Sequence, residues 1–192
     1  MAVCDGITIG STFDCDEPVT PGVDNRLLLG NKQDISVVTH TLTVITAITM
    51  KTTKAMFAFN GIRQSLNPQY QFIPQTVSVG YDHQVDFIVF DISQLQKDNI
   101  EAMGLGKLTA VVENKNSAGN GDNFFEVYGL DVGMEMQTAG RIPMDLETQG
   151  AFSLSLKTSD NEGKEPKMPQ TWFLTDYDTT KALVDALLIP AI

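Results

Sequence analysis

The alternation of apolar and polar positions predicts a chain built mainly of β-strands. Its clearest example is residues 35–50, "ISVVTHTLTVITAITM", where one face carries mostly apolar side chains: Val38, His40, Leu42, Val44, Ile48 and Met50. The other face carries Thr39, Thr41 and Thr43. Because no Gly or Pro interrupts the segment, we expect one strand of about 50 Å. Its expected hairpin partner is residues 55–60, across a turn at 51–54.

Further segments are rich in β-branched and aromatic residues, the composition of strands. They are residues 26–31, 81–90, 107–114, 123–131, 133–138 and 150–158. In the last of these, Phe152, Leu154 and Leu156 share a face. Residues 61–70 and the highly charged residues 159–170 are rich in turn formers, so we expect a polar loop at the first and a long exposed loop at the second.

Two segments predict helices. Ser93 and Gln96 have capping-box spacing and Gly104 follows as a stop, which indicates one short helix. Its expected packing side is Leu95, Ala102 and Met103.

The second predicted helix covers residues 178–190, with Asp178 as the N-cap and Pro190 as the stop. It carries an apolar stripe of Leu183, Val184, Leu187 and Leu188.

These elements predict a mainly β fold: a β-sandwich or barrel with a long hairpin, one short helix inserted between strands and a C-terminal helix. We expect a single β-sandwich domain at residues 26–192, preceded by an extended N-terminal arm at residues 1–25. The arm has two interpretations. It is either a frayed terminus or a segment that becomes ordered on a neighbouring subunit by burying Ile7, Ile9, Phe13 and Val19.

Charge narrows the classes of partner. With 24 acidic and 13 basic residues the net charge is −11, which disfavours binding to nucleic acid phosphates or to an anionic membrane surface. No apolar run reaches the length needed to cross a membrane, and the N-terminal residues lack the basic and apolar regions of a secretory signal. We therefore expect a protein used in the cytoplasm, with Cys4 and Cys15 as free thiols.

Candidate chemistry is sparse. A metal site on His83 would need Asp82 or Asp86, but strand alternation sends those carboxylates to the opposite face. His83 and His40 are therefore expected to be partly buried sheet residues. The glycines of "GLGKLT", residues 104–109, fit a helix stop better than a phosphate loop.

The loop at residues 115–122 allows a loose calcium site from Asn116, Asn120 and Asp122, although a plain hairpin loop is the simpler interpretation. Trp172 is interpreted as a plug of the core, with a sugar-stacking platform as the alternative. We predict no catalytic residue, no cofactor site and no metal site, and hence a protein that is not an enzyme.

The order of elements resembles the tail tube (major tail) proteins of tailed bacteriophages, whose fold is shared with the inner tubes of contractile injection systems. Residues 111–136, "VVENKNSAGNGDNFFEVYGLDVGMEM", together with "ETQGAFSLSLKT" and "EPKMPQTWF", are similar to structural proteins of phages that infect Bacteroidetes. The resemblance covers most of residues 26–189.

The resemblance implies a virion structural protein that assembles into stacked hexameric rings and forms the tube through which DNA is delivered. It also implies assembly in the host cytoplasm, contacts with other virion tail proteins, and DNA that passes the lumen without specific binding. The arm and residues 159–170 would then be contacts between rings. Alternatives are a head decoration protein, a head–tail connector, and a carbohydrate-binding β-sandwich that uses Trp172.

Overall fold

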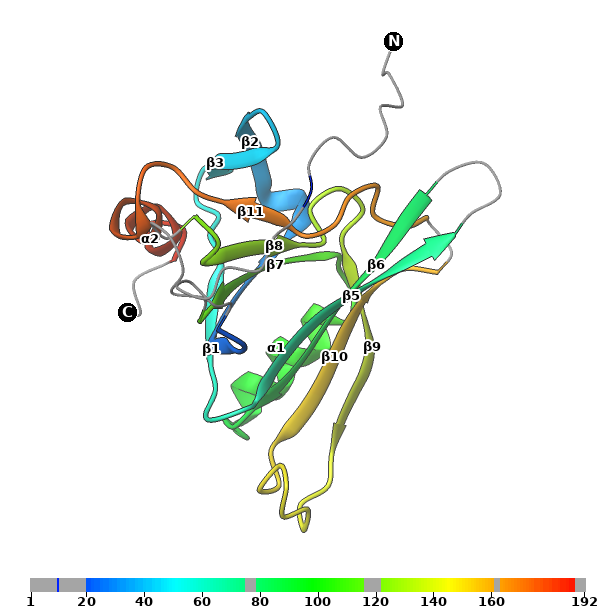
Figure 1. Cartoon of the computed structure of the whole chain (residues 1–192). Coiled ribbons are helices and arrows are strands. Elements are labelled where there is room, and N and C mark those ends of the chain that lie inside the picture. Colours follow the sequence, from blue (N-terminus) through cyan, green and yellow to red (C-terminus); the bar gives the residue numbers. More distant parts are fainter. Residues whose placement is uncertain (1–9, 11–19, 75–78, 116–121, 161–162, 189–192) are drawn as a thin grey trace.

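The computed structural model describes Gly10 and residues 20–74, 79–115, 122–160 and 163–188. The described chain is mainly β (Figure 1): one large mixed sheet of 11 strands, a short helix α1 between β6 and β7, and a C-terminal helix α2. The predicted fold class is confirmed.

The elements follow the chain in a simple order. The strands are β1 (Val23–Asn31), β2 (Ile35–Thr41), β3 (Val44–Met50), β4 (Phe57–Asn60), β5 (Leu66–Pro74), β6 (Val79–Val89), β7 (Leu108–Asn114), β8 (Phe125–Tyr128), β9 (Met134–Arg141), β10 (Phe152–Thr158) and β11 (Gln170–Trp172). The helices are the 3-10 turn Lys32–Asp34, α1 (Gln94–Met103) and α2 (Tyr177–Asp185).

The sheet branches at its central strand, β7. Along the main path the strand order is β2-β3-β11-β8-β7-β9-β10-β6-β5, and β1 lies between β7 and β4 outside that path. The junction between β7 and β9 is one residue pair, Leu108 with Met134. Because only this pair joins the two strands, the part of the sheet with β6 and β10 can pack against one face of β1 and β7.

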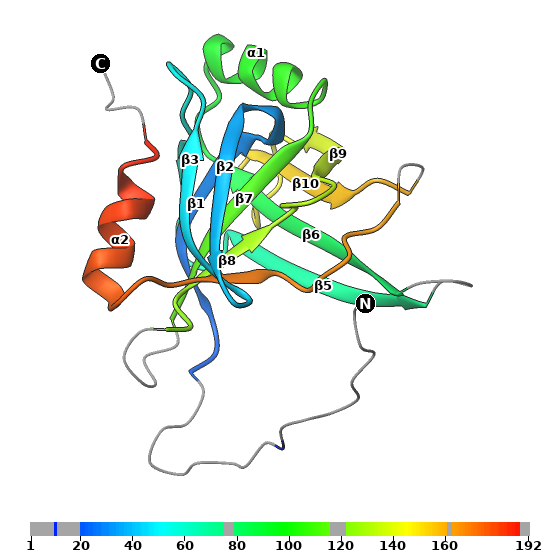
Figure 2. The same ribbon diagram turned by 90° about the horizontal axis from the view of Figure 1, so that it is seen from above.

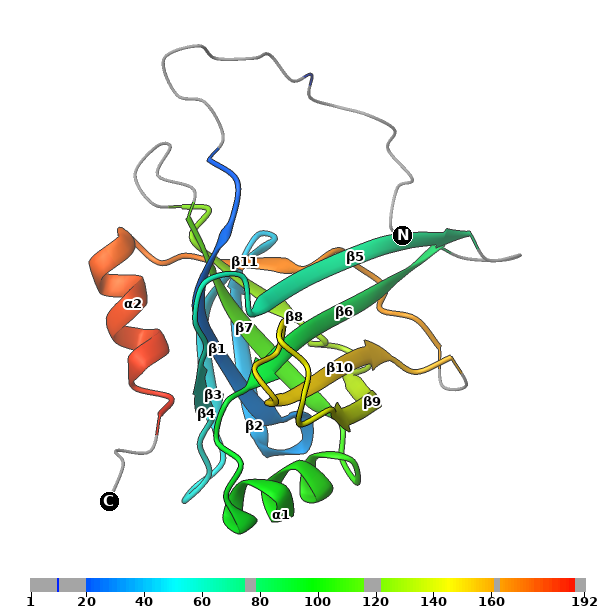
Figure 3. The same cartoon turned by 90° about the horizontal axis from the view of Figure 1, so that it is seen from below.

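Two hydrophobic cores lie on the two faces of β1 and β7. Leu27 and Leu29 belong to the first core, together with β6 and β10, whereas Leu28 belongs to the second, with β3, β11 and α2. Because neighbouring side chains of a strand point to opposite faces, a strand covered on both sides is apolar at every position. This explains the unbroken "LLL" of β1, and Figures 2 and 3 show α2 on one side and β6 and β10 on the other.

The prediction of one long strand at residues 35–50 is wrong. The segment is a hairpin of β2 and β3 in which Thr41 pairs with Val44. Leu42 at the turn has φ 58° and is 96% exposed. A left-handed backbone is unusual for a leucine, so the sequence gives no turn signal there. After the turn, different positions of the segment point to the core than the simple alternation predicts. Ile45, for example, is a fully buried core residue.

The partner predicted for that strand is also wrong. Residues 57–60 form β4, which pairs with β1 in the register Leu29 to Phe57. The long hairpin is β5–β6 instead, and β5 includes residues 66–70, the second half of the region predicted as a polar loop. Pro68 is compatible with this strand because β5 is the last strand of the sheet path, where a missing N–H does not interrupt a ladder.

Helix α1 is confirmed, and its N-cap is Ser93, whose Oγ accepts from the Gln96 amide at 3.2 Å. Its buried side is only partly as predicted: Met103 is buried, whereas Leu95 and Ala102 are exposed and Ile100 is buried instead.

Helix α2 starts slightly earlier than predicted. Its N-cap is Asp176, which accepts from the Thr179 amide at 2.8 Å, rather than Asp178. The apolar stripe packs on the second core as expected, with Val184 and Leu187 buried. Pro190 lies outside the described residues.

Residues 159–170 were predicted to be exposed, but the described part of this segment is anchored on the sheet. Glu165 is 1% exposed, and its carboxylate accepts from the backbone amides of Asp131, Val132 and Gly133 at 2.9–3.0 Å. Because three donors face one carboxylate, a charged side chain can be buried here. The predicted arm lies mostly outside the described residues, and β1 begins at Val23.

Candidate functional site

His83 lies in the sheet as predicted and is 2% exposed. Its Nδ1 accepts from the Gly129 amide at 3.0 Å, and its Nε2 donates to the Lys167 carbonyl at 3.0 Å. Burial lowers the pKa of His83 to about 4. The ring is thus held as a neutral tautomer with both nitrogens occupied, an arrangement suited to structure rather than to proton transfer or metal binding.

The acidic neighbours of His83 on β6 have other partners. Asp82 lies 2.6 Å from Lys164 Nζ and 3.3 Å from Lys157 Nζ. Asp86 accepts from Ser155 Oγ at 2.5 Å. Within the described ranges no group of three or more His, Cys, Asp or Glu side chains could hold a metal ion. Asn116 and Asn120 of the loose calcium site lie outside those ranges.

Trp172 is a core residue, as expected. It is 1% exposed, and its Nε1 donates to the Thr46 carbonyl at 3.4 Å. Because the indole face is covered, it offers no platform for a sugar ring. His40 differs from its prediction: it lies exposed beside the β2–β3 turn, with Nε2 2.9 Å from Gln170 Oε1.

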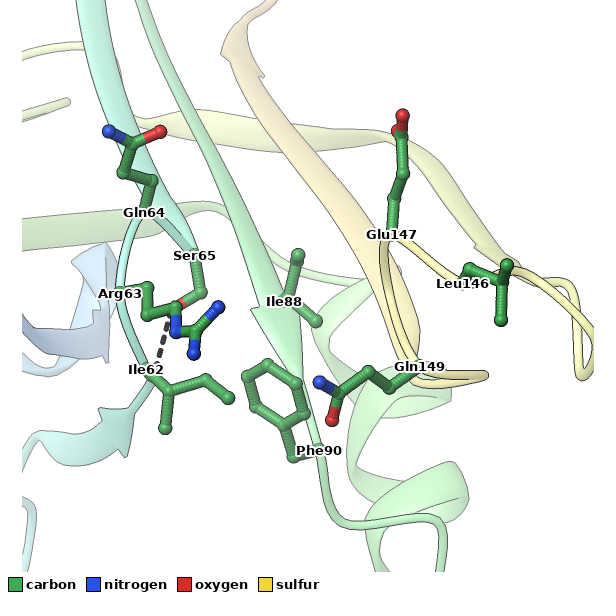
Figure 4. Close-up of a pocket in the computed structure, with 9 residues that line it drawn as sticks. All are labelled: Ile62, Arg63, Gln64, Ser65, Ile88, Phe90, Leu146, Glu147 and Gln149. Carbon is green, nitrogen blue, oxygen red and sulfur yellow. Dashed lines mark hydrogen bonds between the residues drawn. The ribbon is translucent and has the colours of Figure 1, made fainter.

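One hollow of about 500 Å³ lies between the β4–β5 connection, the end of β6 and the β9–β10 loop (Figure 4). Arg63 and Gln149 extend into it from opposite walls, and Ile88 and Phe90 form its apolar floor. The Oγ atom of Ser65 accepts from the Ile62 amide at 2.9 Å. No histidine or cysteine lines the hollow, so these residues offer no nucleophile activated by a neighbouring base.

Exposed apolar side chains gather on two projecting hairpins, one of which, the β9–β10 loop, also contributes Leu146 to the hollow. In the β9–β10 loop, Ile142, Met144 and Leu146 are 67%, 91% and 91% exposed. On the β5–β6 hairpin, Tyr70, Phe72 and Val79 are about half exposed. Figure 1 shows both hairpins extending away from the body of the sheet. Apolar side chains that gather on projecting elements are typical of contact surfaces between proteins.

The outer edge of β5 is the second unusual feature. β5 pairs with β6 over nine residue pairs, from Leu66–Phe87 to Pro74–Val79, and no described strand pairs with its other edge. At the opposite end of the path, β2 has the same kind of open edge and carries the exposed Val37. Open edges present unpaired N–H and C=O groups that can bind a further strand.

No family model, curated protein or solved structure matches this chain. None of the described helices is long and apolar enough to cross a membrane.

Neither surface is predicted by the sequence pattern. Residues 142–147, "IPMDLE", alternate apolar and polar side chains beside a proline, a signal that resembles a short strand as much as a loop. The β5 edge was missed because Pro68 indicated a loop. An alternating segment interrupted by proline is a usable signal for an edge strand.

Proposed function

We propose that this protein is a non-enzymatic virion structural protein, the subunit of a phage tail tube, which assembles into stacked hexameric rings. The observation that carries the proposal is the β5–β6 hairpin, which ends the sheet with an open edge and exposes Tyr70 and Phe72. The number six and the tube come from the resemblance to tail tube proteins.

A strand at an open edge is completed when another chain adds its own strand beside it. Because β5 and β2 lie at opposite ends of one sheet, pairing β5 of one copy with β2 of the next uses each edge once. Such a head-to-tail contact closes into a ring when the rotation between copies divides a full turn. The sheet of each subunit then becomes part of a continuous wall.

The charge supports a conduit. A net charge of −11 repels phosphate, so DNA can slide through a lumen lined by acidic or hydroxyl side chains without binding. The exposed Thr39 and Thr41 of β2 are suited to such a lining. In this proposal the partners are identical copies and other virion tail proteins, the location is the virion tail, and assembly takes place in the host cytoplasm.

The test combines negative-stain electron microscopy with light-scattering mass measurement on purified protein. We expect six-fold rings and tubes for the natural chain. Phe72→Lys places a charge beside the open edge and should leave monomers, because exposed edge lysines prevent strand addition. The matched control is Leu95→Lys, which changes an equally apolar and largely exposed side chain on α1 and should still assemble.

Three results would contradict the proposal. A chain that stays monomeric at every concentration would exclude a ring subunit. Discrete trimers would favour the head decoration alternative. Rings that form equally well with Phe72→Lys would show that β5 is not the contact.

A further inference from the structure

The β9–β10 connection holds an apolar loop, residues 142–147, that the ring contact does not use. Its side chains Ile142, Met144 and Leu146 are the most exposed group of large apolar side chains among the described residues. Removing this much apolar surface from water would be favourable for any complementary partner. The 142–147 loop is therefore a candidate contact in its own right.

The 142–147 loop is ordered by its polar groups. The carboxylate of Asp145 accepts from the amides of Glu147 and Thr148 and from Thr148 Oγ1 at 2.8–3.4 Å. Gly150 has φ 71°, and a Cβ there would meet the Pro143 carbonyl oxygen at 2.7 Å, so the chain crosses itself closely. A loop that is already folded loses little entropy on binding.

A matching apolar groove lies between β3 and α2. It holds about 240 Å³ and is lined mainly by Ile48, Met50, Trp172, Leu183 and Leu187. This is below the roughly 300–1,000 Å³ of pockets for drug-sized ligands and suits one or two aliphatic side chains. The exposed Ala186 stands at its border.

Charge favours the loop as the occupant of the β3–α2 groove. Met50 and Lys54 line the groove, and the turn from Lys51 to Lys54 contains two lysines and no acid. Residues 142–147 contain Asp145 and Glu147 and no base. Lys54 Nζ lies 3.7 Å from Asp34 Oδ1, and Lys51 Nζ donates to the Gln33 carbonyl. Two lysines against one acid leave this border of the apolar groove positively charged, which favours an apolar and acidic partner.

The loop and the groove lie in different parts of the molecule. In Figure 1 the β9–β10 tip projects from the lower end, whereas α2 and β3 lie in the upper half. The loop of one copy therefore reaches the groove of another copy in a head-to-tail contact, which repeats along one direction.

We propose that residues 142–147 of one subunit insert into the β3–α2 groove of a second copy and stack one ring on the next. The inference rests on the proposed function in taking rings as the units that stack. Met144 and Leu146 fill the groove, and Glu147 lies beside Lys54.

The experiment uses two variants that remove opposite halves of the contact. Met144→Ser with Leu146→Ser removes the apolar loop, and Ala186→Trp fills the groove from an exposed position. The matched controls are Leu95→Ser with Leu105→Ser, also largely exposed, and Ala182→Trp, which is exposed on the same helix outside the groove. Circular dichroism verifies that all variants fold.

By electron microscopy we expect single rings from each variant and tubes from both controls. Mixing preformed rings of the two variants restores one loop and one groove at a single junction, so paired rings should form, and no longer stacks.

Variants that still form tubes, or mixed rings that stay single, would overturn this inference and leave the proposed ring contact standing. A natural chain that forms no ring would overturn the proposed function itself.

Discussion

The buried imidazole of His83 predicts a specific pH dependence of stability. In the folded chain the Gly129 amide donates to Nδ1. A proton on Nδ1 would place two N–H donors face to face with no acceptor between them. Burial lowers the pKa of His83 from 6.5 to about 4, and the nearby Asp131 and Asp82 only partly oppose the shift. The unfolded chain therefore binds the proton more tightly than the folded chain.

The sign and size follow from this difference in pKa. Between the two values the unfolded state carries more protons, so stability falls as the pH falls from about 6.5 to about 4. One pKa unit corresponds to 1.36 kcal/mol, and the loss between about pH 7.5 and about pH 4.5 is about 2.5 kcal/mol.

The assay is urea unfolding followed by the fluorescence of Trp172, the only tryptophan in the chain. The reference is His83→Gln, whose amide can accept from Gly129 and donate to Lys167 but does not titrate. Subtracting the two pH profiles removes the contribution of every other group, including Glu165, whose pKa is raised by burial. Identical profiles for the two chains would refute the reasoning.

Further predictions concern single contacts. Glu165→Ala leaves three backbone amides without their acceptor, one of them buried and two partly buried, and should cost about 3 kcal/mol in urea unfolding, whereas Glu147→Ala should cost little. Leu42→Gly relieves a left-handed backbone and should raise the unfolding free energy by about 0.5–1 kcal/mol, and a decrease would contradict the turn. Ser93→Ala removes the cap of α1 and should cost about 1 kcal/mol, measured in the same way. Lys54→Glu should stop the stacking of rings seen by electron microscopy, and adding Glu147→Lys should restore it. Stacking that is the same in both variants and in the natural chain would exclude the charge pairing.

The sequence predicts those elements whose local pattern and final environment agree. β1 and β7 are buried on both faces, and their continuous apolar runs identify them. Ser93 and Gly104 mark the two ends of α1 because caps are local features of the backbone. The fold class could be predicted from such elements alone.

Other elements depend on contacts distant in sequence. The β2–β3 turn requires a left-handed Leu42, a conformation that the surrounding sheet must impose. The burial of residue 165 depends on amides at 131–133, more than thirty residues away. No pattern within residues 159–170 could indicate these partners.

The candidate contact surfaces were harder to predict than the fold. An alternating apolar pattern does not distinguish a face buried in the core from a face exposed on the monomer. Leu146 and Leu154 both lie in alternating segments, and only the exposure in the structure shows that Leu146 is on the surface and Leu154 in the core. The interpretation of Trp172 as a core plug succeeded because a large apolar ring beside Phe173 and the last helix is usually buried.

The central claim is that the outer edge of β5 is completed by a second copy of the chain. Hydrogen–deuterium exchange of the Leu66–Pro74 amides, measured at low and at high protein concentration, tests it directly. We predict that the β5 amides that point away from β6, every second one along the strand, exchange rapidly in the dilute monomer and become protected in the assembled particle. Equal exchange of the β5 amides in the monomer and in the assembled particle would contradict the claim.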